Sequence, residues 1–179
     1  MKPVLYAFLG AVTGTLAAVC ILHVRLDDLP GFWRSSEFDL FPGVIFGLVF
    51  GSVFWAEGRL KPIGVIAFVL AATISNALAV IAGDAVDRPV AALLGAEDTS
   101  DLVFGLSGMI AGALGGGLLG YTSERLLRVS GWWRLMAAGG ALGPLLLFGL
   151  RSHSGLYAFY IVWQAGYAAT MATMGARKK

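Results

Sequence analysis

Residues Leu102–Tyr121 read LVFGLSGMIAGALGGGLLGY, twenty residues without a charged side chain, seven of them glycine. A helix rises about 1.5 Å per residue, so this stretch is long enough to cross a hydrocarbon core of about 30 Å. In water, each glycine would disfavour a helix by up to about 1 kcal/mol relative to alanine. In lipid, the backbone must satisfy its own hydrogen bonds, and a missing side chain leaves room for a neighbouring backbone. The stretch therefore predicts a transmembrane helix with a closely packed partner.

The glycines of this stretch recur at every fourth residue, and the same spacing appears in other apolar segments. Residues four apart lie on one face of a helix, so each series predicts a smooth face that accepts another helix. Two uses of such a face remain open: packing inside a compact bundle, or docking of another membrane subunit or a second copy. The predicted helix-packing residues are Gly10, Gly14, Gly43, Gly47, Gly51, Gly108, Gly112, Gly116, Gly120, Gly139 and Gly143.

The composition excludes an ordinary soluble domain. Of the 179 residues, 58% are hydrophobic and 13% are charged, whereas soluble domains carry about 25% charged residues. We expect an all-α, polytopic membrane protein in which residues 1–179 form a single integral membrane domain. The first apolar run is interpreted as a retained helix, because it is longer than the core of a signal peptide and further spans follow. The six predicted spans are residues 4–22, 41–56, 62–83, 102–121, 135–150 and 155–175.

The segments between these spans and the two ends of the chain carry the charges. Residues 23–40 and 84–101 are predicted to be surface loops, the second with a short surface helix over Pro89–Leu94. Within the fifth span, Pro144 predicts a kink, because proline has no N–H for the helix ladder.

The basic residues separate onto alternate sides of the six spans. The side with both termini has nine, and the other side has four. By the positive-inside rule both termini are cytoplasmic, which predicts a multi-pass protein of the cytoplasmic (inner) membrane. The nine also suit anionic lipid headgroups, at about 1 kcal/mol each. They are Lys2, Arg59, Lys61, Arg125, Arg128, Arg134, Arg177, Lys178 and Lys179; the four are Arg25, Arg34, Arg88 and Arg151.

Several functional classes lack their usual residues. The predicted spans contain no Asp, Glu, Lys, Arg or His, whereas proton relays and ion-coupled pumps usually carry such groups within the membrane. The chain contains neither a Gly-x-Ser-x-Gly elbow nor a His-Glu-x-x-His motif. His23 and His153 fall in separate loops, and Cys20 is the single cysteine. We therefore expect no catalytic residues, no cofactor, no metal site and no nucleic-acid partner.

Two amide side chains stand out within the predicted spans. Asn76 and Gln164 each bring a group that hydrocarbon cannot satisfy. One interpretation is that they bond to a neighbouring helix and stabilise packing by about 0.6–2 kcal/mol. The other places Asn76, Tyr160, Trp163 and Gln164 around a small internal pocket that binds a substrate. Both interpretations stay open at this point.

In overall plan the chain resembles the small substrate-capturing subunits of energy-coupling-factor vitamin transporters. The resemblance lies in the length, the six predicted spans, the cytoplasmic ends and an alanine pair four residues apart, Ala7 and Ala11. It implies that this pair docks a transmembrane coupling protein and that outer loops close over a vitamin. The sequence thus favours a transport-type component that captures or conducts a small solute. The alternative is a non-catalytic accessory or assembly subunit of a larger membrane complex.

Overall fold

The computed structural model describes residues 2–23, 31–97, 100–147 and 152–176, without the side chains of residues 23, 31–39 and 176. In these residues the chain is all-helical apart from one short strand pair. The α-helices are α1 (Lys2–His23), α2 (Gly31–Ala56), α3 (Pro62–Leu94), α4 (Asp101–Leu127), α5 (Trp132–Leu142) and α7 (His153–Ala172). A 3-10 turn, η1 (Gly143–Leu145), follows α5, and strands β1 (Val129–Ser130) and β2 (Gly175–Ala176) pair antiparallel.

Three of these helices are long and apolar enough to cross a membrane. They cover Lys2–Leu22, Pro62–Leu94 and Asp101–Leu127, and the apolar part of α2, Leu40–Ala56, is shorter. Large apolar side chains such as Phe8 of α1 and Ile66 of α3 lie on the outside of the bundle, 64% and 57% exposed. Water would not favour so many exposed apolar groups, so these helices indicate a membrane protein.

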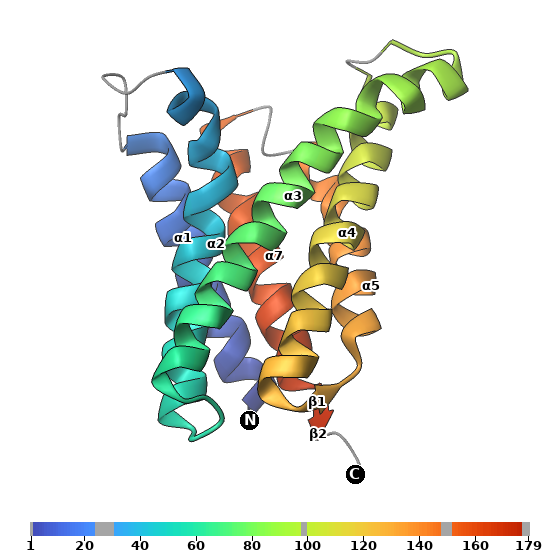
Figure 1. Ribbon diagram of the computed structural model, residues 1–179. Coiled ribbons are helices and arrows are strands. Elements are labelled where there is room, and N and C mark those ends of the chain that lie inside the picture. Colours follow the sequence, from blue (N-terminus) through green and yellow to red (C-terminus); the bar gives the residue numbers. More distant parts are fainter. Residues whose placement is uncertain (1, 24–30, 98–99, 148–151, 177–179) are drawn as a thin grey trace.

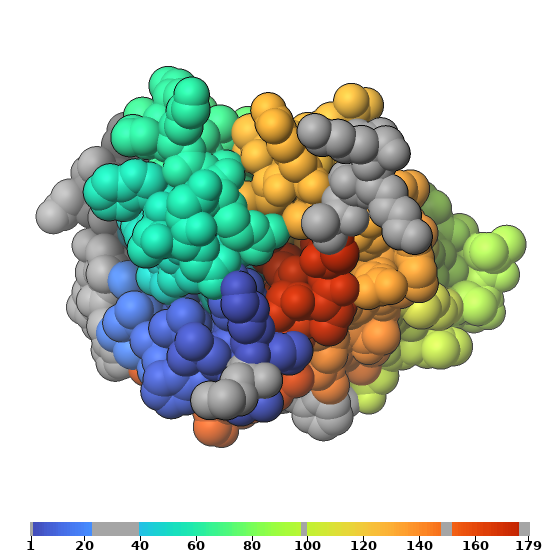
Figure 2. All heavy atoms as spheres, turned by 90° about the horizontal axis from the view of Figure 1, so that it is seen from below, coloured from blue at the N-terminus to red at the C-terminus, as the bar shows by residue number. Residues whose placement is uncertain are grey.

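The helices run side by side and alternate in direction, and the N- and C-terminal ends lie at the same end of the bundle (Figure 1). Viewed from that end, the last turns of α7 are surrounded by α1, the turn between α2 and α3, and the α4–α5 connection (Figure 2). Helix α1 packs on α7, α2 on α3, and α4 on both α3 and α5. Helix α7 therefore joins the two halves of the bundle.

Helix α3 does not end at Gly83, so the predicted loop over residues 84–101 is wrong in its first half. The helix continues through Pro89 to Leu94 and ends at Gly95, which has a left-handed φ of 60°. Asp84 and Arg88 lie one turn apart in an order that supports a helix, and the segment ends in Ala91, Ala92, Leu93 and Leu94, which are good helix formers. With 33 residues, α3 is about 50 Å long and exceeds the apolar layer of about 30 Å. Charge marked the edge of that layer, not the end of the helix.

Helix α2 likewise begins at Gly31, ten residues before the predicted span, and Pro42 lies inside it. The predicted loop over residues 23–40 is therefore helical from residue 31, and residues 24–30 lie outside the described part. The charged residues of this segment suggested a loop, but a helix that extends beyond the apolar layer can carry charged side chains. A proline inside the helix removes one backbone donor, which neighbouring groups compensate in membrane helices.

The predicted fifth span begins earlier and is interrupted as expected. Helix α5 begins at Trp132, and the α-helix gives way at Leu142 to the 3-10 turn that contains Pro144. The break fits the kink expected there, because proline cannot donate to the helix ladder. Residues 148–150 of this span lie outside the described residues.

The carboxylate of Glu124 in α4 caps the start of α5. Its Oε1 accepts hydrogen bonds from the backbone N–H groups of Gly131 (2.6 Å) and Trp132 (2.9 Å). Gly131 has a φ of 109°, a conformation that favours glycine. The carboxylate satisfies two free donors at the positive end of the helix dipole.

Replacing Glu124 by alanine is therefore expected to lower the free energy of unfolding by about 1–2 kcal/mol. Glu124→Gln retains an acceptor oxygen and should lose less. Denaturant titration of the detergent-solubilised chain measures both. An alanine variant as stable as the unchanged protein would rule out the cap.

Candidate functional site

A small cavity of about 30 Å³, partly open to the outside, lies between α2, α3, α4 and α7. About 10–15 Å³ measured in this way holds one water molecule, so the cavity has room for roughly two or three. Its walls are formed by Pro42, Gly43, Phe46, Ala72, Ser75, Asn76, Gly115, Leu119, Trp163, Gln164 and Tyr167.

The polar groups of this wall are deeply buried. Gln164 is 2% exposed and Ser75 is 3% exposed. The amide nitrogen Nε2 of Gln164 donates a hydrogen bond to the carbonyl oxygen of Pro42 at 3.2 Å. The other amide atom, Gln164 Oε1, and Ser75 Oγ have no hydrogen-bond partner among the described residues. A buried polar atom left unpaired costs about 1–3 kcal/mol. Both oxygen atoms are closed off from the open space of the cavity, whose surface is almost entirely apolar.

Aromatic rings of α7 form the rest of one wall. The ring of Trp163 stacks on that of Phe159, with the ring centroids 5.6 Å apart. It lies edge-on to the ring of Tyr167, with the centroids 5.1 Å apart. The hydroxyl of Tyr167 donates to the carbonyl oxygen of Gly112 in α4 at 3.0 Å. The hydrogen bond and the ring contacts hold this wall in one arrangement, as a binding pocket needs.

The structure brings three of the four residues proposed as a substrate site to one cavity. Asn76 of α3 and both Trp163 and Gln164 of α7 line it. Tyr160 does not line it: it lies one turn earlier in α7, with its ring 6.2 Å from that of Trp163, and its backbone contacts α1 at Gly14.

Sequence reasoning missed Ser75 and Tyr167 as wall residues. A signal existed for each, because Ser75 directly precedes Asn76, and Tyr167 follows Gln164 by three residues and so shares its helix face. The contribution of Pro42 had no local signal, since it lies 122 residues from its partner Gln164.

The glycines that the four-residue spacing singled out lie at contacts between helices of this chain. A Cβ added to any of them would come within 3.0 Å of an atom of a neighbouring helix, which real Cβ atoms rarely do. They are Gly10 and Gly14 against α7, Gly43, Gly47 and Gly51 against α3, and Gly108, Gly112, Gly116 and Gly120 of α4 against the α5–η1 segment with Gly139 and Gly143.

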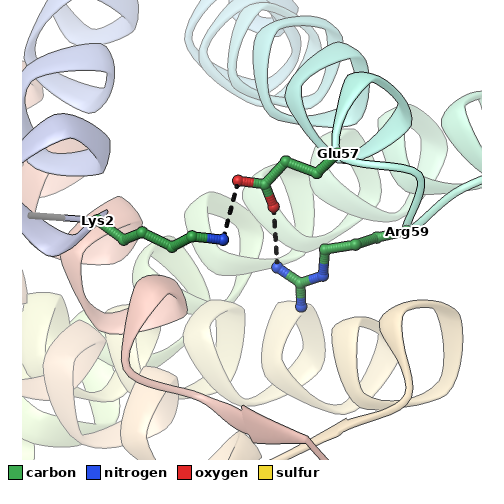
Figure 3. A network of polar contacts seen from close by, with 3 residues as sticks. All are labelled: Lys2, Glu57 and Arg59. Atoms are coloured by element: carbon green, nitrogen blue, oxygen red, sulfur yellow. Dashed lines mark hydrogen bonds and ion pairs between the residues drawn. The ribbon is translucent and has the colours of Figure 1, made fainter.

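Charged side chains lie at the ends of the bundle, away from the cavity. At the end with the termini, Glu57 lies between Lys2 at 3.5 Å and Arg59 at 3.6 Å (Figure 3). These ion pairs are partly exposed and contribute about 0–1 kcal/mol each. In the described part of the chain, His, Cys, Asp and Glu form no group of three or more that is suited to a metal ion.

Comparison of the chain with models of protein families, with curated proteins and with solved structures gives no match.

Proposed function

We propose that this protein is a transport-type component of the membrane that captures or conducts a small solute at the central cavity. The observation that carries the proposal is the cavity between α2, α3, α4 and α7, which is lined by the buried polar residues Gln164 and Ser75.

The size of the cavity limits the solute. As it stands, the cavity has room for two or three water molecules and does not hold a molecule of the size of a vitamin. The resemblance to vitamin-capturing subunits is therefore not extended to their ligand. No ion-coupling carboxylate and no enzymatic step belong to this proposal.

The membrane arrangement forms part of the same proposal. We infer six spans with both termini in the cytoplasm, and a location in the cytoplasmic (inner) membrane. Support comes from the basic residues of α4 and its connection, among them Arg125 and Arg128, which lie at the end that holds the termini, while Asp84 and Asp101 lie at the opposite end. In this orientation the basic end faces anionic lipid headgroups.

The alternative, an accessory or assembly subunit, depended on a glycine face free to dock a partner. Each glycine series instead faces another helix of the same chain. We propose that these faces hold the bundle together, because close backbone approach provides the van der Waals contacts that drive association in lipid. The alternative thus loses the feature that favoured it.

The test is thermal unfolding of the purified, detergent-solubilised chain against a panel of small neutral solutes, amino acids and inorganic ions. A solute at ten times its Kd adds about 1.4 kcal/mol, which raises the Tm of a chain of this size by about 3–5 °C. Gln164→Leu should abolish that shift, because it removes both polar atoms of the amide.

The matched control is Thr170→Val, also on α7. The Thr170 hydroxyl bonds within its own helix, to Gly166 O at 2.7 Å, and the residue is outside the cavity wall. This variant should keep the full shift. If no solute in the panel stabilises the chain, or if Gln164→Leu responds like the unchanged protein, the proposed function is wrong.

A further inference from the structure

We infer that the outer face of α4 binds one anionic phospholipid, with its phosphate at Arg125 and Arg128 and an acyl chain along the apolar residues that precede them. The inference rests on the part of the proposed function that sets the basic end of the bundle against anionic headgroups. It narrows that general contact to one site, and it does not depend on the cavity or its solute.

An exposed stripe runs along α4 on the side away from its glycine face. Leu114, Leu118, Tyr121 and Arg125 follow one another at helical spacing and so lie on one face. Leu114 is 55% exposed and Tyr121 is 49% exposed. The stripe changes from apolar to aromatic to cationic over about 16 Å, close to half of an apolar layer of about 30 Å. A phospholipid in one leaflet presents its acyl chain, its glycerol esters and its phosphate in the same order.

The side chain of Arg125 is held at the level of lipid headgroups. Its guanidinium carbon lies 5.2 Å from the centre of the Tyr121 ring, and its Nη2 donates a hydrogen bond to the Tyr121 hydroxyl at 3.1 Å. The side chain therefore points back along α4 toward the apolar residues. Trp132 and Trp133, both exposed at the start of α5, mark the same level, because tryptophan gathers at membrane interfaces. One hydrogen bond uses one of five guanidinium N–H donors, so four remain for phosphate oxygens.

No carboxylate of the described residues neutralises Arg125 or Arg128. The acid next to them in sequence, Glu124, has its Oε1 on the two N–H groups that begin α5. The ion pairs of the described part of the chain lie instead at the turn between α2 and α3, around Glu57. Both arginines are exposed. A lipid phosphodiester would provide the missing negative charge through charge-assisted hydrogen bonds.

Native mass spectrometry of the full-length chain in mild detergent tests the site, because it counts the lipids bound to each molecule. Dioleoyl phosphatidylglycerol and dioleoyl phosphatidylcholine are matched probes: they share acyl chains and phosphate, but the second carries a compensating cation. We expect one phosphatidylglycerol to stay bound at concentrations where phosphatidylcholine does not. The double variant Arg125→Gln with Arg128→Gln should weaken this binding by about 25-fold, since each basic side chain near anionic lipid contributes about fivefold.

The matched control is Arg59→Gln with Lys61→Gln. It removes the same charge at the same end of the bundle, but beside α3, and it should leave the binding of phosphatidylglycerol nearly unchanged. Equal losses in the two double variants would overturn the site and leave the general contact with anionic headgroups standing. If the Arg125 and Arg128 double variant does not fold, the two single variants are compared, and each should lose about fivefold.

Inorganic phosphate is the third probe, because it carries the charge without the acyl chains. Displacement of phosphatidylglycerol by an equal concentration of phosphate would overturn the part assigned to the apolar stripe. Equal binding of the two phospholipids would overturn the site. A dimer that the Arg125 and Arg128 double variant separates would assign this face to a second copy and overturn it as well. None of these outcomes bears on the solute, which the thermal unfolding panel tests separately.

Discussion

Replacing Gly112 by leucine is expected to prevent α4 from packing on α5 and to destabilise the chain by about 3 kcal/mol or more. A Cβ at this position would lie 2.8 Å from the carbonyl carbon of Gly139, and a backbone cannot move aside as a side chain does. Overpacking a core usually costs about 1–3 kcal/mol. Here the helices must separate, and the Gly112 carbonyl would also lose its hydrogen bond from Tyr167.

Gly117→Leu is the matched control on the same helix. A Cβ there meets only the flexible side chain of Met136, with its nearest atom at 3.6 Å. This variant should fold in normal yield and change the free energy of unfolding by less than about 1 kcal/mol. The higher helix propensity of leucine offsets part of any loss. Folded yield after detergent extraction and denaturant titration measure both variants. Equal behaviour of the two variants would contradict the packing role of Gly112.

Cysteines placed at residues 97 and 128 are expected to react with a membrane-impermeant thiol reagent from opposite sides of the membrane. Glu97 follows α3 and Arg128 follows α4, so they lie at opposite ends of the bundle, and both are exposed. In a Cys20→Ala background, Arg128→Cys should be labelled only from the cytoplasmic side and Glu97→Cys only from the outer side. The expected contrast is nearly complete, because a charged reagent does not cross the apolar layer.

Lys61→Cys serves as the internal reference for that experiment. Lys61 precedes α3 at the end that holds the termini and is exposed. It should be labelled from the same side as Arg128→Cys. Labelling of positions 97 and 128 from one side would overturn the six-span arrangement and the orientation together.

Much of the helical structure could be predicted from local sequence. The apolar run that begins at Leu102 lies within α4, and the four-residue spacing of Gly108 and Gly112 placed both on one face, because helix periodicity is a local property. The ends of the helices were predicted less well. α3 passes Gly83 and α2 begins at Gly31, since charged residues mark the limit of an apolar layer and do not stop a helix.

The candidate site, too, was predictable from the sequence only in part. The amides of Asn76 and Gln164 were conspicuous in apolar surroundings, so the sequence alone indicated which buried polar groups needed partners. It could not indicate that Pro42 O is the partner of Gln164, or that Ser75 lies beside the same cavity. Tyr160 shares the helix face of Gln164 but does not line the cavity, because it lies one helical turn earlier in α7.

The sequence by itself determined a helical, apolar chain, the faces of its helices that are smooth, and the asymmetry of its charges, because these follow from composition and helical period. Only the tertiary structure decided which smooth face meets which helix and where the cavity lies. One glycine face fits another almost equally well, and the choice among partners depends on contacts between residues distant in the chain, such as Gln164 with Pro42.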